Sequence, residues 1–549
     1  DRGSDTLLLK NTSQPRLGFR VNKIYIDSYY MDPQTKKYPE ANRELMKQFN
    51  EGMLVFNYIG HNDSEVGFTG EGLFSRYEMD HLTNTRLPLF ITITCDYCQF
   101  DAEDVSAGEN VFLNPSAGAI ALITTTRVVY TDGNDKINRR LMKRLLERDS
   151  NGSPLRIGDV LKLAKRDFNT EIDKNKLNYV LIGDPALKLA YPEHSIQVTR
   201  INGNSGEKNI EMIPGKNYTV EGEIRSHQNE LLSDFNGYIY YNLYDKEKQF
   251  TTLAHQDKKT WTYTHRPDLL TTGKGTIQNG TFRITVTLPI DNSHSGKSGL
   301  LNLYAYDESG REANGYTDKL IVSTAVEPIT EDIQGPDIEF AGINDDSFTE
   351  GILVNNPATF VCKFSDPSGI WSGNSLGKQM TLSLDGACIE ENVARYYKPI
   401  AESEIPEGEF IYPLPRLSNG LHTLTFKVFD TLGNSSEVTI AFEVKENSET
   451  YTISLEEEPA TERATISCQD QNGNDVTESK HTRISVTNTL GEEIWSYETT
   501  ENNLFPLTWN LQDNNGKRVS AGQYYCKGYF ETSAGTIVTP AKKIVVITQ

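Results

Sequence analysis

The stretch that decides the fold covers residues 53–101 and reads MLVFNYIGHNDSEVGFTGEGLFSRYEMDHLTNTRLPLFITITCDYCQFD. It contains two short apolar runs, 53–59 and 89–94, and each is followed closely by a residue with reactive chemistry. Such β-branched and aromatic runs are typical of buried strands. In a parallel sheet covered on both faces, ligands collect beyond the carboxyl ends of the strands. We therefore predict that His61 and Cys95 emerge at one edge of a sheet.

The segment between these runs is long enough for a right-handed crossover, and it contains a polar, helix-like piece at 75–82. That connection makes His61 and Cys95 neighbours. A cysteine nucleophile reacts as the thiolate, and a nearby imidazole lowers the thiol pKa and carries the proton. Cys98 lies past the predicted strand end, so its placement favours Cys95 as the nucleophile. The same spacing also fits a turn histidine and a buried thiol without a chemical role.

The spacing Cys95-Asp96-Tyr97-Cys98 superficially resembles a redox or zinc motif. A structural zinc site needs four ligands, and no second Cys or His pair lies nearby to supply the other two. We therefore expect no metal at this position and no cofactor for the chemistry, while a structural Ca²⁺ elsewhere in the chain stays open.

Length and charge limit the classes of protein and partner. A chain of 549 residues is too long for one core, so about three to five domains are expected. The net charge of −22 repels phosphate backbones and anionic lipid surfaces, which excludes nucleic acid as a partner. No apolar run approaches the ~20 residues that cross a bilayer, and nothing resembles a signal peptide. We interpret the chain as the carboxyl-terminal part of a larger precursor, with residues 1–20 as a cleaved or truncated edge.

The first part of the chain alternates buried strands with amphipathic helices, which is typical of a parallel α/β sheet. Strands are expected at 21–27, 53–59, 89–94, 117–123 and 179–182, and helices at 42–49, 137–147 and 157–168. From residue 191 onward the helical periodicity gives way to short strands separated by Gly, Asn, Asp and Pro, which favours β-sandwiches. The predicted domains are 1–191, 192–326, 327–447 and 448–549.

In the last domain, residues 508–525 read as a strand, an Asn-Gly turn and an aromatic strand, and predict a compact hairpin.

The β domains also contain a few cysteines. The pairs Cys362 with Cys388 and Cys468 with Cys526 would suit intradomain disulfides in an oxidising compartment, although the sequence does not show whether the sulfur atoms meet.

The order of motifs in the first part resembles the gingipain family of cysteine peptidases. The similar segments are Gly60-His61, the strand that ends at Cys95, 116–127 and 179–187. The resemblance implies a caspase-like catalytic domain, of which this chain holds the later part. It also implies that Cys95 is the nucleophile and His61 the general base and then general acid. The family has glycine after the histidine, whereas Asn62 stands here, and its backbone N–H is a candidate oxyanion donor.

Within that family, Thr94-Cys95-Asp96-Tyr97 and 106–110 are most similar to the surface sortase of the type IX secretion system. The last domain resembles the carboxyl-terminal signal domains of proteins that this system exports. The resemblance implies that the protein cleaves such signal domains from cargo and passes the acyl group to an amine on anionic lipopolysaccharide. It further implies a location at the cell surface, retained by the outer-membrane barrel protein PorV.

Other roles rest on position alone. Thr124, Thr125 and Thr126 end a central strand, and we expect either a substrate pocket there or ordinary strand polarity. The group that orients His61 is not identified. Candidates by position are Asp27, Asp63, Glu65 and a carboxylate outside this chain. Two alternative functions also remain, a hydrolytic gingipain-like endopeptidase and a catalytically inactive surface scaffold.

Overall fold

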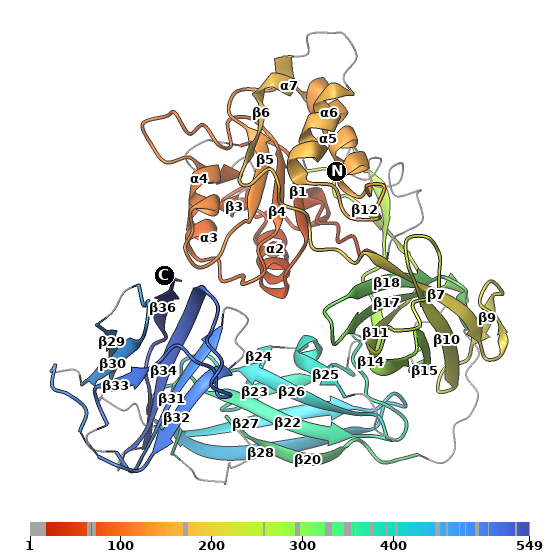
Figure 1. Ribbon diagram of the computed structural model, residues 1–549. Helices are drawn as coiled ribbons and strands as arrows, with labels where there is room; N and C mark the ends of the chain where they lie inside the picture. Colours follow the sequence, from red (N-terminus) through yellow and green to blue (C-terminus); the bar gives the residue numbers. More distant parts are fainter. Residues whose placement is uncertain are drawn as a thin grey trace.

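The computed structural model of the chain describes residues 18–547 except 63–66, 69–72, 168–173, 256–258, 291–296, 324–331, 345–352, 355, 374, 376, 391, 401–404, 445–450, 457–458, 471–472, 478, 489–492, 503 and 533–534. Figure 1 shows an α/β domain at the top of the view and three domains made of strands below it. No helix among the described residues is long and apolar enough to cross a membrane.

The α/β domain is built on a four-stranded sheet in the order β1-β4-β5-β6. These strands are β1 (Val55–Ile59), β4 (Leu89–Ile93), β5 (Ala121–Thr125) and β6 (Tyr179–Ile182). The first three are parallel, as predicted, whereas β6 runs antiparallel to β5. The reason is that the chain enters β6 beside the carboxyl end of β5, where Thr126 N donates to Asn178 O.

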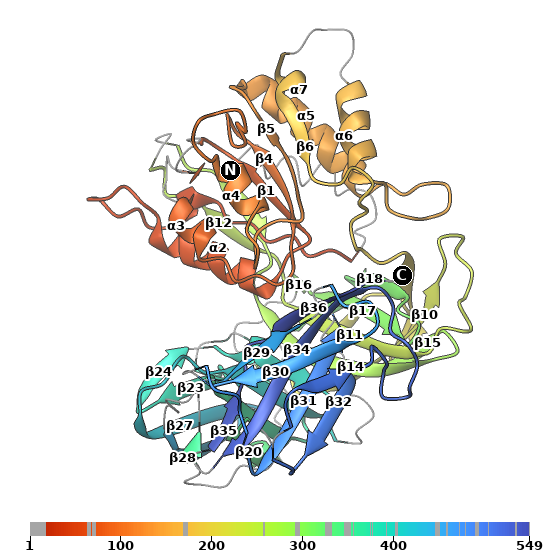
Figure 2. The ribbon, with the colours of Figure 1, turned by 60° about the vertical axis from the view of Figure 1, so that its left-hand side comes forward.

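Helices cover both faces of this sheet. Every residue of β4 and of β5 is therefore buried. Figure 2 shows α2, α3 and α4 on one side and α5 and α6 on the other. Two separate apolar clusters result, one around Phe49 and Phe90 and one around Ile91 and Leu141. The helices are α2 (Pro39–Glu51), α3 (Arg76–Asp80), α4 (Ala107–Phe112), α5 (Thr131–Leu145), α6 (Ile157–Arg166) and α7 (Lys174–Asn178).

The strand predicted at 21–27 is wrong. This segment contains only the short 3-10 helix η1 (Ile26–Ser28) and does not join the sheet. Its polar groups are used in contacts with a hairpin of the next domain, β12 (Lys248–Thr251) and β13 (Thr262–His265). The Asp27 carboxylate accepts hydrogen bonds from Ala254 N at 3.0 Å and His255 N at 2.7 Å. The segment therefore connects two domains instead of extending the sheet.

Removing the Asp27 carboxylate tests this connection. We expect Asp27→Ala to lower the free energy of unfolding by about 1–3 kcal/mol, because two backbone N–H groups lose their acceptor. Hydrogen exchange at Ala254 and His255 should rise at the same time. Asp32→Ala is the matched control, since Asp32 accepts from Gln34 N and Thr35 N within its own turn. Equal rates of amide hydrogen exchange at Ala254 and His255 in the two variants would contradict the role of Asp27 in connecting the two domains.

The first β domain is a single sheet that closes on itself in the order β10-β15-β14-β11-β17-β18-β7, with β7 pairing again with β10. The two layers of the predicted sandwich are thus joined into one ring. A register shift at Glu221 and Gly222, typical of a bulge that bends a strand, lies in the closing pair. The ring strands are β7 (His194–Ile201), β10 (Asn217–Arg225), β11 (Gly237–Tyr244), β14 (Leu269–Gln278), β15 (Thr281–Thr287), β17 (Leu300–Asp307) and β18 (Glu312–Thr317).

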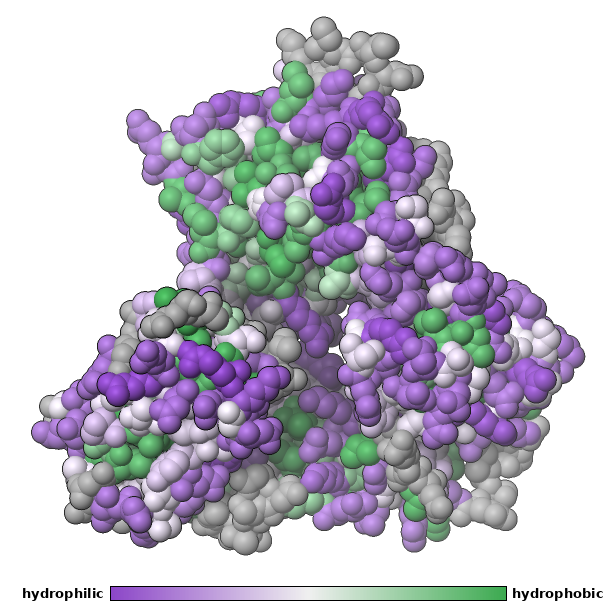
Figure 3. Space-filling view, viewed as in Figure 1, coloured by the Kyte–Doolittle hydropathy of each residue, from purple (hydrophilic) through white to green (hydrophobic). Residues whose placement is uncertain are grey.

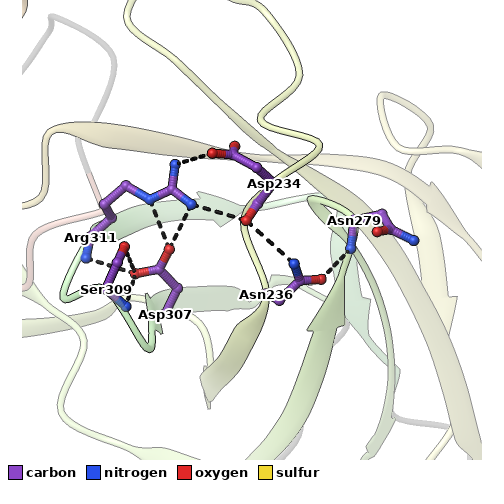
Figure 4. Close-up of polar contacts among 6 residues, drawn as sticks. All are labelled: Asp234, Asn236, Asn279, Asp307, Ser309 and Arg311. Atoms are coloured by element: carbon purple, nitrogen blue, oxygen red, sulfur yellow. Dashed lines mark hydrogen bonds and ion pairs between the residues drawn. The ribbon is translucent and has the colours of Figure 1, made fainter.

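A polar cluster ties together the turns at one end of this ring (Figure 4). The nearly buried Asp307 accepts from Ser309 and from Arg311 Nε at 2.8 Å, and Arg311 Nη1 reaches Asp234 at 2.9 Å. Burial favours a higher pKa for Asp307, but the hydrogen bonds from Ser309 and Arg311 outweigh it and lower the pKa. The ionised carboxylate therefore stabilises the folded ring.

Because the folded pKa of Asp307 is lowered, its contribution is present at neutral pH and is lost as the pH falls through that pKa. We expect Asp307→Asn to cost about 2 kcal/mol at pH 7 and progressively less under acid conditions. Denaturant unfolding at several pH values measures this. The control is Asp318→Asn, which removes an exposed ion pair with Lys319 and should cost less than about 0.5 kcal/mol. A cost for Asp307→Asn that does not change with pH would contradict the prediction.

The remaining two domains are sandwiches of two sheets, as predicted. In the second β domain the sheets are β20-β22-β26-β25 and β21-β28-β27-β23-β24. Their strands are β20 (Asp337–Ile343), β21 (Leu353–Val354), β22 (Thr359–Ser365), β23 (Thr381–Leu384), β24 (Ala387–Glu390), β25 (Tyr397–Pro399), β26 (Glu407–Pro413), β27 (Gly420–Phe429) and β28 (Ser435–Val444). A core of aromatic and aliphatic side chains that includes Phe410 and Phe426 lies between the two sheets.

In the third β domain the predicted hairpin at 508–525 is wrong. The strand that ends at Trp509 pairs with β30, and the strand that begins at Gly522 pairs with β31 in the other sheet. The Asn515-Gly516 turn exists, but the chain crosses between sheets around it because Trp509 and Leu511 are buried in the core. The strands are β29 (Thr452–Leu455), β30 (Ala464–Gln469), β31 (His481–Asn488), β32 (Glu493–Thr499), β33 (Leu507–Trp509), β34 (Gly522–Thr532), β35 (Gly535–Val538) and β36 (Lys542–Val546).

All six cysteines are described, and all six are free thiols. Cys362 is buried in β22, whereas Cys388 is exposed on β24 in the other sheet. Cys468 and Cys526 are both buried in the core of the third β domain. The disulfides considered from the sequence are therefore not present in this structure.

Candidate active site

The parallel pairing of β1 with β4 determines where His61 and Cys95 lie. The register places Ile59 opposite Ile93, so each reactive residue stands two positions beyond the same pair. Gly60 N also donates to Ile93 O at 3.4 Å, which continues the pairing past the strand ends. Because adjacent strands lie about 4.8 Å apart, the two residues emerge side by side at the carboxyl edge of the sheet.

Asn62 links the two loops directly. Its Nδ2 donates to Cys95 O at 3.0 Å, and its Oδ1 is buried without a hydrogen-bond partner among the described residues. On the other side of His61, Tyr58 OH donates to His61 O at 2.8 Å. The main chain around the histidine is thus held from both sides, while its ring is exposed.

A sharp turn separates Cys95 from Cys98. Asp96 adopts φ of 48°, in the left-handed region, and the chain then returns to the domain with Tyr97 fully buried. Cys98 N donates to Thr125 O at 3.0 Å, and its side chain is fully buried. Cys95 is half-buried, and its Sγ lies 3.4 Å from Val129 O. The turn therefore presents Cys95 at the edge and turns Cys98 inward.

Burial raises the pKa of the Cys98 thiol to about 11, with Glu109 contributing in the same direction and a hydrogen bond from Ser106 opposing it. At neutral pH the Cys98 thiol is therefore protonated as well as inaccessible. A thiol in this state is a poor nucleophile. The burial and the protonation of Cys98 both argue against Cys98 as a nucleophile.

Alkylation kinetics test this assignment. At pH 7–8 we expect iodoacetamide to label Cys95 faster than the exposed Cys388, because an adjacent imidazole activates the thiol. Cys98 should stay unlabelled until the pH approaches 11. His61→Ala should slow labelling of Cys95 to about the rate of Cys388. Peptide mass spectrometry follows the three sites in one experiment, and labelling of Cys98 at the rate of Cys95 at pH 8 would refute the assignment.

The three threonines proposed for a substrate pocket have different surroundings. Thr124 and Thr125 are fully buried. Thr124 Oγ1 accepts from Thr92 Oγ1 at 2.6 Å, and Thr125 Oγ1 donates to Thr94 O. Both hydroxyls are thus used inside the sheet. Thr126 is half-buried beyond the end of β5, and its N–H and hydroxyl donate to Asn178 O.

No described residue forms a hydrogen bond with the His61 ring. Asp27 does not serve as its partner, because both Asp27 carboxylate oxygens accept from the hairpin of the first β domain. Asp63 and Glu65 lie outside the described residues. The group that orients the imidazole stays unassigned.

The structure also reveals two contributors that the sequence analysis missed. The Val129 carbonyl contacts the Cys95 thiol, and Asn175 holds the neighbouring Tyr130 by accepting from its N–H at 3.0 Å and donating to its carbonyl. A backbone carbonyl leaves no mark in the sequence. Asn175 reads as an ordinary polar residue between two lysines.

Among the described residues, one group of acidic side chains has the geometry of a metal site. Asp332, Asp366 and Asp430 bring carboxylate oxygens within 4.8 Å of one another, and Asp366 and Asp430 are buried. Carboxylates in this number suit Ca²⁺. They lie in the second β domain and in the segment that leads into it, so they take no part in the chemistry at Cys95. A structural Ca²⁺, which the sequence leaves open, is not tested by this geometry.

Comparison with known proteins identifies the class of the first domain. Residues 6–190 match the family model described as peptidase family C25. The match confirms the predicted family resemblance of the first domain, and it includes His61, Cys95 and the whole four-stranded sheet. No curated protein matches the chain.

Among solved structures, the chain is similar to dimeric latent PorU from Porphyromonas gingivalis, with 24% identity, a TM-score of 0.33 and coverage of 79% of this chain and 41% of that one. It is also similar to the Arg-specific cysteine proteinase gingipain R, with 17% identity, a TM-score of 0.26 and coverage of 53% and 57%. An immunoglobulin-like pair from the Drosophila receptor tyrosine phosphatase DLAR covers 39% of this chain at 11% identity and a TM-score of 0.20. The chain thus spans less than two thirds of the PorU structure and of the gingipain R structure.

Proposed function

We propose that the protein is a cysteine acyltransferase that acts at the cell surface on secreted proteins. The observation that carries this proposal is the parallel register of β1 and β4, which brings His61 and Cys95 to equivalent positions beyond Ile59 and Ile93. The burial of Cys98 supports it, because only one thiol of the Cys-Asp-Tyr-Cys sequence is then left for chemistry.

The proposed reaction begins when His61 takes the proton of the Cys95 thiol and the thiolate attacks a peptide carbonyl. The peptide C–N bond breaks, His61 returns the proton to the departing amine, and the acyl group remains on Cys95 as a thioester. The oxyanion needs fixed donors, for which the backbone N–H groups of Asn62 and Cys95 are available. The hydrogen bond from Asn62 Nδ2 to Cys95 O supports this role, because it fixes the two loops relative to one another.

In the second half of the reaction, an amine attacks the thioester, the C–S bond breaks, and Cys95 recovers its proton through His61. Transfer to an amine requires that water attacks more slowly. We propose that the acyl donors are secreted cargo proteins cleaved at their C-terminal signal domains. The acceptor is an amine on anionic lipopolysaccharide, and the outer-membrane barrel protein PorV retains the enzyme at the surface. The similarity of 94–97 and 106–110 to the type IX sortase supports these assignments.

Incubating a cargo protein that bears its signal domain, with and without an amine acceptor, tests the proposal. We expect cargo joined to the acceptor, and a drop in turnover of at least about 10²-fold in Cys95→Ala. Cys388→Ala is the matched control, since it removes an exposed thiol of the second β domain and should retain the parent rate.

The outcomes separate three functions. Hydrolysed cargo alone, even at high acceptor concentration, would replace the transferase by a gingipain-like endopeptidase. Parent turnover by Cys95→Ala would remove Cys95 from the mechanism. If neither product forms and Cys95 reacts with iodoacetamide no faster than Cys388, the domain is an inactive scaffold.

A further inference from the structure

Exposed apolar residues flank Val129, the residue whose carbonyl contacts the proposed nucleophile. The Cys95 Sγ contacts the carbonyl of Val129, and the residues on either side, Val128 and Tyr130, are 56% and 70% exposed. Leu177, on α7, is 65% exposed, and its neighbour Asn178 donates from Nδ2 to Val128 O at 2.9 Å. In the space-filling view of Figure 3, hydrophobic residues gather on the α/β domain, whereas the domains below it are mostly hydrophilic.

These side chains are presented on a fixed backbone. Asn175, only 2% exposed, clamps the main chain of Tyr130 through both its amide oxygen and its amide nitrogen. Asn178 holds the same segment at Thr126 and Val128. The backbone that carries these apolar residues is held by a buried amide, so its conformation is fixed before a ligand binds. Such surface is ready to receive an apolar group without further ordering.

Two carboxylates close to Cys95 in the sequence, Asp96 and Asp101, do not favour a basic substrate side chain. Asp101 is occupied by a paired contact with Arg127, at 3.0 Å to Nη1 and 2.6 Å to Nη2. Burial raises the pKa of Asp96, and only Arg127 opposes that rise. Recognition of a basic side chain requires an available carboxylate, and Arg127 pairs with Asp101 and acts electrostatically on Asp96.

We propose that Val128, Tyr130 and Leu177 form an apolar specificity rim that selects substrates with an apolar or aromatic residue at the carbonyl that Cys95 attacks. The Val129 carbonyl contacts the sulfur, and consecutive Cα atoms are about 3.8 Å apart, so Val128 and Tyr130 are the residues adjacent to this contact. The residue that supplies the attacked carbonyl is the part of a bound polypeptide nearest to them. This inference rests on the proposed acyl chemistry at Cys95.

Peptidyl acyloxymethyl ketones that differ only in their last residue test the rim. Four probes end in Phe, Leu, Arg or Asp, and the rate of covalent labelling of Cys95 in the full chain is followed by mass spectrometry. We expect the Phe and Leu probes to label at least about tenfold faster than the Arg and Asp probes. Tyr130→Ser should reduce the ratio of the Phe rate to the Arg rate severalfold, and Tyr130→Phe should retain it. Leu421→Ser, which removes an exposed leucine of the second β domain, should leave the ratio unchanged.

The two levels of inference fail in different ways. If no probe modifies Cys95, or if modification is equal in His61→Ala, the acyl chemistry itself is refuted. If Cys95 is modified but the Arg or Asp probe reacts as fast as the Phe probe, the rim is refuted and the chemistry stands. An unchanged ratio in Tyr130→Ser, with the variant folded by circular dichroism, also refutes the rim.

Discussion

The pairing of β1 with β4 is the constraint on which the candidate site depends. Two parallel strands in fixed register bring Ile59 opposite Ile93, and this alone converts two residues far apart in sequence into neighbours. A slip of one residue would turn the buried face of β1 outward, so the core on both sides of the sheet enforces the register. Phe56 and Phe90 pack on one face with ring centroids 4.9 Å apart. The chemistry at the edge is thus positioned by hydrophobic packing beneath it.

Sequence patterns predict the parts of the fold that depend on local periodicity. The apolar runs that became β1 and β4, the helix that became α2, and the change of texture near residue 191 were all readable because buried strands and amphipathic helices leave regular spacing. Residues 21–27 alternate like a strand, yet they are held by a hairpin more than 200 positions away. The turn at Asn515-Gly516 has the composition of a hairpin, but burial of Trp509 and Leu511 directs the chain to another sheet. Both errors have the same origin, a tertiary contact that overrides a local preference.

The candidate site divides in the same way. Cys95 and His61 could be singled out because a thiol and an imidazole are the side-chain types that the proposed chemistry uses. The carbonyl of Val129 and the clamp by Asn175 could not, because backbone groups and second-layer amides have no distinctive residue type. Thr124 and Thr125 were attractive by position, but a hydroxyl at the last positions of a fully buried strand bonds to the neighbouring strand. Only the structure distinguishes a strand end that faces solvent from one that is covered.

The geometry of the edge also explains why one short sequence contains two cysteines with different properties. A left-handed residue at Asp96 reverses the chain, so Cys95 stays beside the loop at Val129 while Tyr97 and Cys98 enter the core below α4. The packing that raises the pKa of Cys98 also anchors the turn that carries Cys95. A buried thiol three residues after the proposed nucleophile is therefore part of the packing that holds the turn. Gly108 is close to this anchor, since a Cβ there would stand 2.6 Å from the Cys98 Cβ, which means that α4 approaches the turn as closely as the backbone allows.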